Sequence, residues 1–215
     1  MVSSSAGRLP APDCGLCPRL AAFRAGLRAE HPDWFNAPVP PFGPDEARLG
    51  IIGLAPGLRG ANRTGRPFTG DFAGELLYGT LKKHGFARGA YAARADDGLE
   101  LVDCVIINAV RCVPPQNRPT PAEIRACNGF LKAELEARGS LRVLLALGRI
   151  AHDAVLMAHG LVRARYPFAH GALHELPRGR VLLDSYHCSR YNTQTGRLTP
   201  VMFDEIILTA RRLLS

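Results

Sequence analysis

Four short runs of apolar residues, separated by stretches with helical periodicity, most constrain the fold of this chain. The runs are nearly continuous and do not alternate, as expected of strands buried on both faces of a sheet. Strands that alternate with helices predict right-handed crossovers and a parallel sheet between two helical layers. We therefore expect an α/β protein, a three-layer α/β/α fold with a central four-stranded, mostly parallel sheet. The predicted strands are 49–52, 101–109, 141–147 and 181–185.

Five segments have the periodicity of helices, and two of them begin with explicit capping signals. Thr120 precedes Pro121 at the first helical position, and Glu123 follows at the third, which is the pattern of a capping box. Thr199 repeats the start signal before Pro200. A short hairpin, FAHGALHELPRGR, is expected between the third and fourth strands. The predicted helices are about 19–29, 71–84, 121–137, 149–159 and 200–213.

The length of 215 residues and an apolar content of 47% allow one large core. We expect a disordered tail at residues 1–13 and a single domain at 14–215. The formal net charge of +8 favours a polyanionic partner such as nucleic acid, although the arginine-rich composition of a GC-rich genome gives the same excess. No signal segment or membrane-length apolar stretch occurs, so we expect an intracellular protein with no membrane partner.

Four of the six cysteines fall into two pairs with ligand-like spacing. Cys14 and Cys17 form a C-x2-C pair in a loop-like setting, and Cys112 and Cys127 form a C-x14-C pair in mid-chain. Inside cells such cysteines are more often ligands or free thiols than disulfides. Two thiolate pairs can hold Zn²⁺ or an iron–sulfur cluster, and spacing alone does not decide between them. The alternative, ordinary buried thiols and a stray turn, fits the Pro- and Gly-rich surroundings of the first pair poorly.

Three unusual segments follow predicted strands, where sheets of this kind bind their ligands. The first, residues 53–71, is too long and too rich in glycine for a plain turn, and it lacks the P-loop pattern. Phe68 can offer its ring to a planar ligand or simply anchor the loop to the core. Asp71 ends the loop, where it can cap a helix or position a water molecule.

The second and third segments carry amides and a histidine. Asn108 and Asn117, in residues 108–120, have the paired donor and acceptor groups that read the edge of a base, although a turn alone accounts for Asn117. His187, in residues 185–199, emerges from a buried strand. A structural histidine is the default interpretation, but the carboxyl end of a strand favours a function. Histidines without such placement are expected to be structural: His152, His159, His170 and His174.

Taken together, these segments resemble the uracil-DNA glycosylases, and most closely the fifth, iron–sulfur-containing family of that superfamily. The matching motifs, in the family's order and spacing, are GLAPG, NRTGRPFTGD, VRCVPPQNRPTPAEIRAC and SYHCSRYNTQTGRLT. The resemblance implies an enzyme of DNA base-excision repair that flips a nucleotide out of the duplex and hydrolyses its N-glycosidic bond, leaving an abasic site. It also implies free thiols at Cys104 and Cys188. The implied ligands of a 4Fe–4S cluster are Cys14, Cys17, Cys112 and Cys127.

The resemblance also assigns catalytic and binding roles. Asp71 would orient the attacking water and stabilise the sugar cation, and His187 would hydrogen-bond the base carbonyl oxygen as negative charge develops there. Asn117 would help to hold water or base. The implied base-binding residues, with Phe68 stacking on the base, are Gly53, Leu54, Ala55, Phe68 and Asn108. The implied DNA contacts, to phosphates or as a wedge, are Ser189, Arg190, Tyr191 and Asn192.

Three departures from the family pattern bear on these roles. The first motif lacks the acidic or amide residue of most related families, so Asp71 must act from farther downstream. Cys188 stands where proline usually follows the histidine, which makes the loop less rigid. Asn108 resembles the uracil-reading amide of the fourth family, which would narrow a range of deaminated bases that otherwise includes hypoxanthine.

The expected partner is double- or single-stranded DNA that contains uracil or another deaminated base. The expected state is a monomer in the bacterial cytoplasm, associated with the nucleoid. No lysine falls in the matched catalytic motifs, so a Schiff-base lyase step is not expected and the glycosylase would be monofunctional. Two other hypotheses are a non-catalytic iron–sulfur nucleic-acid-binding module, which does not require Asp71 and His187, and an iron–sulfur redox protein, which leaves the strand-end loops unexplained.

Overall fold

A computed structural model describes residues 7–215, and its centre is a five-stranded sheet with the order β4-β1-β5-β7-β6. The first four strands of this order are parallel, and β6 (Leu173–Leu176) pairs antiparallel with β7. The prediction of a mostly parallel sheet is therefore confirmed, with one strand more than expected. The parallel strands are β4 (Cys104–Asn108), β1 (Leu49–Gly53), β5 (Val143–Leu147) and β7 (Arg180–Ser185).

The additional strand lies in the segment for which the sequence predicts a hairpin. β6 runs into a turn at Pro177–Gly179 and the chain returns as β7, so a hairpin forms, with the predicted fourth strand as its second arm. The side chains of β6 are largely exposed, and Leu176 is its buried residue. An antiparallel edge strand does not need the continuous apolar run that marks a doubly covered strand. This is why the sheet has five strands where the pattern indicated four.

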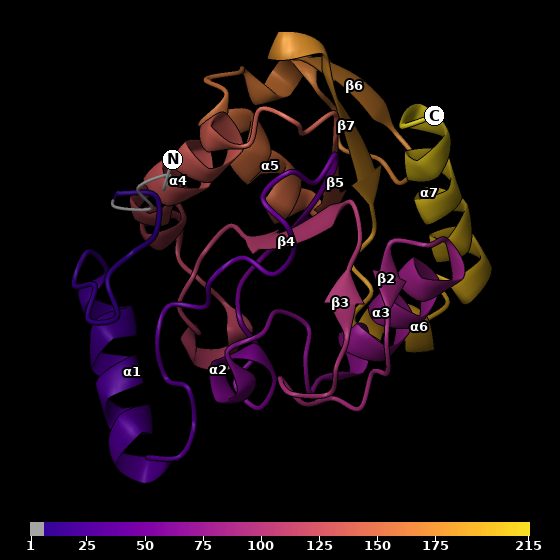
Figure 1. The fold of residues 1–215 in the computed structure, drawn as a ribbon. Helices are drawn as coiled ribbons and strands as arrows, with labels where there is room; N and C mark the ends of the chain where they lie inside the picture. Colours follow the sequence, from indigo (N-terminus) through magenta and orange to yellow (C-terminus); the bar gives the residue numbers. More distant parts are fainter. Residues whose placement is uncertain (1–6) are drawn as a thin grey trace.

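Helices cover both faces of the sheet, which confirms the three-layer arrangement (Figure 1). α3 (Phe72–Lys83) and α7 (Pro200–Leu213) pack on one face. α4 (Pro121–Ala137) and α5 (Arg149–Ala158) pack on the other. With α1 (Pro18–Glu30), these are the predicted helices, and each of their ends lies within one residue of the predicted position. No helix in residues 7–215 has the length and apolarity needed to cross a membrane.

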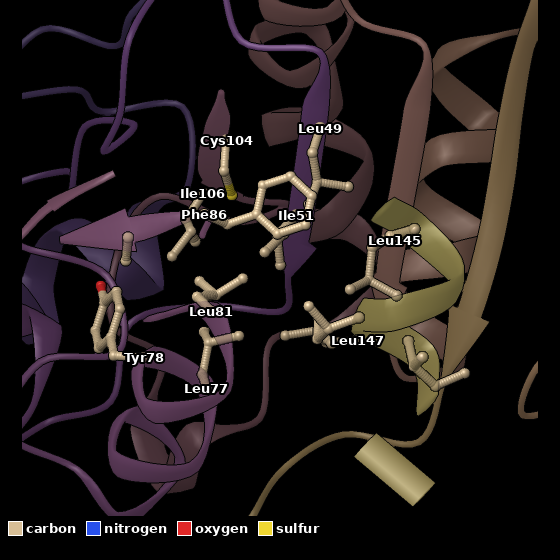
Figure 2. Packing of buried hydrophobic residues seen from close by; sticks show 14 of the residues in the cluster. Leu49, Ile51, Leu77, Tyr78, Leu81, Phe86, Cys104, Ile106, Leu145 and Leu147 are labelled. Carbon is tan, nitrogen blue, oxygen red and sulfur yellow. The ribbon is translucent and has the colours of Figure 1, made fainter. Parts of the chain in front are cut away.

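Neighbouring residues of a strand point into different cores. Ile51 packs with α3 and α7, whereas Ile52 packs with α4 and α5. Figure 2 shows the first of these cores, in which Leu77 and Leu81 of α3 meet Ile51 of β1 and Leu145 of β5. Burial on both faces explains why the parallel strands read as continuous apolar runs in the sequence.

The predicted second strand is shorter than expected. Asp103 has a φ of +54°, which interrupts the run, so β4 begins only at Cys104. The residues before it, β3 (Glu100–Leu101), pair instead with β2 (Ala87–Arg88) in a separate ribbon after α3. A single residue in left-handed backbone thus divides one apparent strand into two elements.

The first six residues of the expected disordered tail lie outside the described residues. Residues 7–13 differ from that expectation because they contact the body of the protein. Arg8 Nε lies 3.1 Å from Glu134 Oε1, and Asp13 pairs with Arg28. These ion pairs hold the segment against α1 and α4.

Candidate active site

A cavity of about 370 Å³ opens at the carboxyl ends of the parallel strands, and we call it the base cavity. Its walls come from the loops after β1, β4 and β7 and from the start of α3. The volume lies in the range of small-ligand sites, roughly 300–1,000 Å³. The predicted site residues that line it are Leu54, Ala55, Phe68, Asp71, Asn108, Asn117, His187, Ser189 and Arg190. The cavity is also lined by Gly57, one of the glycines of the 53–71 loop, and by three residues that the sequence did not single out, Ala61, Phe72 and Ala73.

Gly53, also predicted to bind the base, lies behind the cavity wall and not on it. A Cβ added at Gly53 would lie 2.5 Å from Asn108 Oδ1 and 3.0 Å from the ring of Phe68. Glycine therefore allows both side chains to lie directly against β1. Its role is to admit the side chains of Asn108 and Phe68, which themselves face the cavity.

Residues 189–192, which follow His187, differ from one another in their contacts and roles. Ser189 accepts a hydrogen bond from the backbone nitrogen of Asn192 at 3.4 Å and so caps α6 (Arg190–Gln194). Arg190 lines the cavity, whereas Tyr191 is 71% exposed and does not. The amide of Asn192 donates to the backbone oxygen of His187 at 2.8 Å. Asn192 therefore holds the histidine loop in place, a role that the sequence did not indicate.

Asp71 stands at the N-terminus of α3 with its two carboxylate oxygens in different surroundings. Oδ1 accepts a hydrogen bond from the backbone nitrogen of Gly74 at 3.0 Å, which caps the helix. Oδ2 faces Gly57 and Gly60, since Cβ atoms added there would lie 3.5 and 2.8 Å from it. Burial raises the pKa of Asp71, and the backbone N–H groups of Gly74 and Ala73 oppose that shift. One oxygen is thus fixed while the other is turned toward the loop that lines the cavity.

His187 lies beside Phe68 in the cavity wall, with their ring centroids 5.9 Å apart. Burial lowers the pKa of His187 to about 4. The imidazole is therefore neutral at neutral pH, when it carries one N–H donor and one acceptor nitrogen. A neutral donor at this position can stabilise an oxygen on which negative charge develops.

Phe68 is held in a backbone conformation that few residues adopt. Its φ of +51° lies in the left-handed region, which costs a non-glycine residue of order 1–3 kcal/mol. The Tyr91 hydroxyl donates to the backbone oxygen of Phe68 at 3.2 Å and accepts from the backbone nitrogen of Gly70 at 3.4 Å. Strain of this kind persists where surrounding contacts enforce it, often at ligand sites. Tyr91 supports the site although no sequence motif contains it.

Gly74→Ala is expected to lower the free energy of unfolding by about 1–3 kcal/mol, because the added Cβ would lie 1.9 Å from the backbone oxygen of Phe68. The measurement is denaturant unfolding of the variant. Gly79→Ala in the same helix is the matched control, since nothing lies within 4 Å of its added Cβ. This control is expected to be neutral or more stable by about 0.5–1 kcal/mol. Equal stability of the two variants would contradict the tight packing at Gly74.

Asn108 and Asn117 both line the base cavity, but they differ in burial. Asn108 is 2% exposed, and its Oδ1 has no hydrogen-bond partner within residues 7–215. A buried carbonyl left without a partner costs about 1–3 kcal/mol, which a ligand with an N–H group would remove. Asn117 is exposed at the cavity mouth, with a φ of +55° that fits the turn expected of it.

The four paired cysteines meet in a second cavity, between the start of α1, the end of β4 and α4. An Nη atom of Arg24 donates to the Sγ of Cys112 at 3.2 Å, and the backbone nitrogen of Arg111 donates to the Sγ of Cys127 at 3.4 Å. The structure therefore brings together the predicted ligands. Cys104 and Cys188 are buried in the α3/α7 core, apart from this cavity.

Arg111 lines the cysteine cavity with an unpaired guanidinium. Its side chain is 1% exposed, and none of its three guanidinium nitrogens has a hydrogen-bond partner in the described part of the chain. Burial lowers the pKa of Arg111, and Glu134 and Cys127 oppose that shift. A buried cation is costly unless an anionic group compensates it. The cysteine cavity is thus suited to an occupant with negative charge.

A third group of possible ligands comes from α5, β6 and β7 and consists of His152, His174 and Asp184. His152 Nδ1 lies 2.8 Å from Asp184 Oδ1, and its Nε2 lies 2.9 Å from the backbone oxygen of Tyr166. Burial alone lowers the pKa of His152, but the bond to Asp184 outweighs this effect and the pKa is raised. Both ring nitrogens of His152 are thus engaged, as in a structural histidine.

Comparison with known proteins agrees with the resemblance found in the motifs. Residues 40–211 match the family model described as Uracil DNA glycosylase superfamily. The chain is 50% identical over 207 residues to a Type-5 uracil-DNA glycosylase of Thermus thermophilus, covering 93% of each chain. It is 40% identical over 227 residues to that of Mycobacterium leprae, covering 99% of each. A Type-4 uracil-DNA glycosylase of Archaeoglobus fulgidus is 33% identical over 65% of this chain and 63% of its own. The chain therefore belongs to the uracil-DNA glycosylase superfamily and, within it, to the type-5 family.

Proposed function

We propose that this chain excises uracil from DNA in base-excision repair by hydrolysing the N-glycosidic bond, leaving an abasic site. One observation carries this conclusion: the base cavity combines Asp71, His187, Phe68 and Asn108. These residues supply a carboxylate, a neutral hydrogen-bond donor, a stacking ring and an amide. The names of the type-5 relatives support the same activity.

Binding begins with a flipped nucleotide, since the glycosidic bond is not accessible inside a duplex. The uracil ring would stack on Phe68, an interaction worth about 1–3 kcal/mol per base. Asn108 would read the polar edge of the ring: its Oδ1 accepts from the ring N–H, and its amide nitrogen donates to the neighbouring carbonyl. The unpartnered state of this Oδ1 supports the assignment.

Cleavage of the C–N bond places positive charge on the deoxyribose and negative charge on the departing base. Asp71 would use Oδ2 to orient the attacking water and to stabilise the sugar cation, while Oδ1 remains bonded to Gly74. His187 would donate to the base carbonyl oxygen as its negative charge grows. Asn117 would hold water or base at the cavity mouth. The two tasks of Asp71 thus fall on different oxygens: the fixed Oδ1 caps the helix, and the free Oδ2 would serve catalysis.

The test is incubation of the protein with duplexes that carry uracil, hypoxanthine or xanthine, followed by alkali. Alkali-labile sites are expected with uracil. A non-catalytic nucleic-acid-binding module would bind the same duplexes without creating such sites. Absence of alkali-labile sites with all three duplexes would overturn the proposal.

Asn108→Ala is expected to lower the kcat/KM ratio of uracil to hypoxanthine by about tenfold or more, since a bidentate amide contact is worth about 1–3 kcal/mol of discrimination. The amide favours the smaller ring, and its removal both deletes the contact and enlarges the cavity. Steady-state kinetics on the two substrates measure the ratio. An unchanged ratio would show that Asn108 does not select the base.

We also propose that Cys14, Cys17, Cys112 and Cys127 hold a 4Fe–4S cluster. A tetrahedral zinc site with Zn–S bonds of about 2.3 Å sets its sulfurs about 3.8 Å apart. No three of these four sulfurs, all in the described residues, lie within 4.8 Å of one another, which favours a larger group. The unpaired Arg111 and the two N–H groups that donate to sulfur suit an anionic cluster.

In this proposal the cluster supplies structural support, because it ties the N-terminal segment to the loop that carries Asn117. Purified protein is expected to be brown and to contain about four irons per chain. Metal analysis of anaerobically prepared protein measures this. Stoichiometric zinc without iron would overturn the assignment.

The remaining expectations belong to the same proposal. The substrate is double- or single-stranded DNA with uracil or another deaminated base, and a substrate in the genome places the enzyme at the bacterial nucleoid, in the cytoplasm. The enzyme acts as a monomer and without a lyase step. Strand breaks formed before alkali treatment, together with a protein–DNA adduct trapped by borohydride, would contradict the monofunctional mechanism.

A further inference from the structure

A groove of about 680 Å³ adjoins one wall of the base cavity, and we call it the Arg59 groove. The two hollows are continuous, because they share the lining residues Gly57, Asp71, Phe72, Asn117 and Arg190. The other charged side chains of the groove are Arg59, Arg63 and Glu75. Three arginines thus outnumber the two carboxylates that line it.

A smaller hollow of about 290 Å³ adjoins a different wall of the base cavity, and we call it the Arg149 hollow. It shares His187 with the base cavity, whereas the Arg59 groove does not contain that residue. Its lining includes Arg149 and Arg197 and, among the described residues, no carboxylate. The Arg149 hollow and the Arg59 groove therefore flank the base cavity at two separate walls.

The arginines of the Arg149 hollow are held against aromatic rings. The Arg149 guanidinium carbon lies 5.4 Å from the ring centroid of Phe168, and that of Arg197 lies 4.6 Å from that of Tyr186. Such cation–π contacts are worth about 0.5–1 kcal/mol at exposed sites and orient the guanidinium groups. The positive charge is thus placed before any ligand arrives.

Four arginines line the Arg59 groove or the Arg149 hollow but not the base cavity, and they differ from many others of this chain because they form no ion pair among the described residues. Within residues 7–215, Arg59, Arg63, Arg149 and Arg197 take part in none of the ion pairs. Some exposed arginines elsewhere are paired, as Arg88 is with Glu100 and Arg163 is with Asp153, whereas others, such as Arg125 and Arg178, are free in the described part of the chain but line neither hollow. Cations left unpaired beside a hollow are available to phosphate groups.

We propose that the DNA strand carrying the excised base runs from the Arg59 groove across the base cavity to the Arg149 hollow. Arg59 and Arg63 bind phosphates on one side of the flipped nucleotide, and Arg149 and Arg197 bind phosphates on the other. This path rests on the proposed function, since a nucleotide held in the base cavity has its neighbours on either side. Phosphate contacts of this kind fix register and orientation without reading sequence.

The experiment uses single-stranded oligonucleotides in which the chain extends only 5′ or only 3′ of the uracil. Two double variants are compared: Arg59→Gln with Arg63→Gln, and Arg149→Gln with Arg197→Gln. Each is expected to raise KM about tenfold or more for one extension only, and the two variants should affect opposite extensions. Each should also reduce the slope of log K against log salt by about 0.7 per lost contact. The single-turnover rate at saturating DNA stays unchanged.

The control is Arg88→Gln with Arg163→Gln, two exposed and paired arginines that line neither hollow, and no change in KM or salt slope is expected. Equal effects of both double variants on both extensions, or unchanged salt slopes, would overturn the path while leaving uracil excision by the wild type intact. Failure of the proposed function has a different signature, because the wild type would then release no uracil from any oligonucleotide.

Discussion

Asp71→Asn is expected to lower the rate of uracil release by about 10²–10⁴ while leaving the fold and the affinity for abasic DNA nearly unchanged. Asparagine and aspartate are about equally good at capping a helix, so the bond to the backbone nitrogen of Gly74 is retained. In the proposed mechanism the substitution removes the negative charge that orients water and balances the sugar cation. Single-turnover kinetics, binding to abasic DNA and thermal unfolding measure the three quantities.

Asp71→Ala separates capping from catalysis. It removes the cap as well as the charge, so it should lose about 1 kcal/mol of stability that the asparagine variant keeps. Both variants should be equally poor catalysts. If Asp71→Asn lost affinity for abasic DNA to the same extent as uracil release, the residue would be a binding group and the catalytic role would fail.

The pH profile gives a second signature of Asp71. Burial raises its pKa, so uracil release by the wild type should fall with decreasing pH at a point above the ordinary aspartate value of 3.8. The rate falls toward low pH because, in the proposed mechanism, the charged form of Asp71 is the active one and protonation removes it. The pKa of His187 is lowered to about 4, so this residue is neutral at pH values above that. The acid limb set by Asp71 should be absent from Asp71→Asn.

His187→Ala is expected to lower kcat by about 10²–10³, the usual cost of one oxyanion donor. KM should change little, because the donor acts on charge that appears only in the transition state. His187→Gln keeps an N–H donor and should recover part of the rate. His159→Ala is the control, since His159 follows the last residue of α5, is hydrogen-bonded to the backbone oxygen of Val155 and does not line the base cavity. Equal rates for His187→Ala and His187→Gln would argue against hydrogen bonding as the source of the effect.

Much of this architecture could be predicted because local sequence signals and tertiary structure agree. The capping box at Thr120 is present, with Glu123 accepting from the backbone nitrogen of Thr120 at 2.7 Å. Asp71 ends the segment after the first predicted strand and starts a helix, and His187 follows a buried strand. Because sheets of this kind bind ligands at the carboxyl ends of their strands, the sequence alone predicts that the two residues lie near each other. Their assignment as catalytic residues depended on the family resemblance, because the same signals also fit a cap and a structural histidine.

The parts that the sequence did not predict depend on contacts between segments that carry no motif. Tyr91 reaches Phe68 from the loop after β2, and its role appears only when that loop folds over α3. Arg149 flanks the cavity from the start of α5, and Arg197 from the loop between α6 and α7. The unpaired state of Arg111 follows from burial, which a single arginine in a motif does not reveal. Residues that support a site through tertiary contacts therefore escape a reading based on spacing.

The proposed cluster has a consequence for the unfolding of the protein. The cysteines proposed as its ligands span residues 14–127, more than half of the chain, so a cluster bound by them would close one very long loop. Complete unfolding must break that closure, and a released iron–sulfur group does not reassemble from the unfolded chain alone. Unfolding would then be irreversible, and the lifetime of the enzyme would be set by the rate of opening and not by an equilibrium free energy.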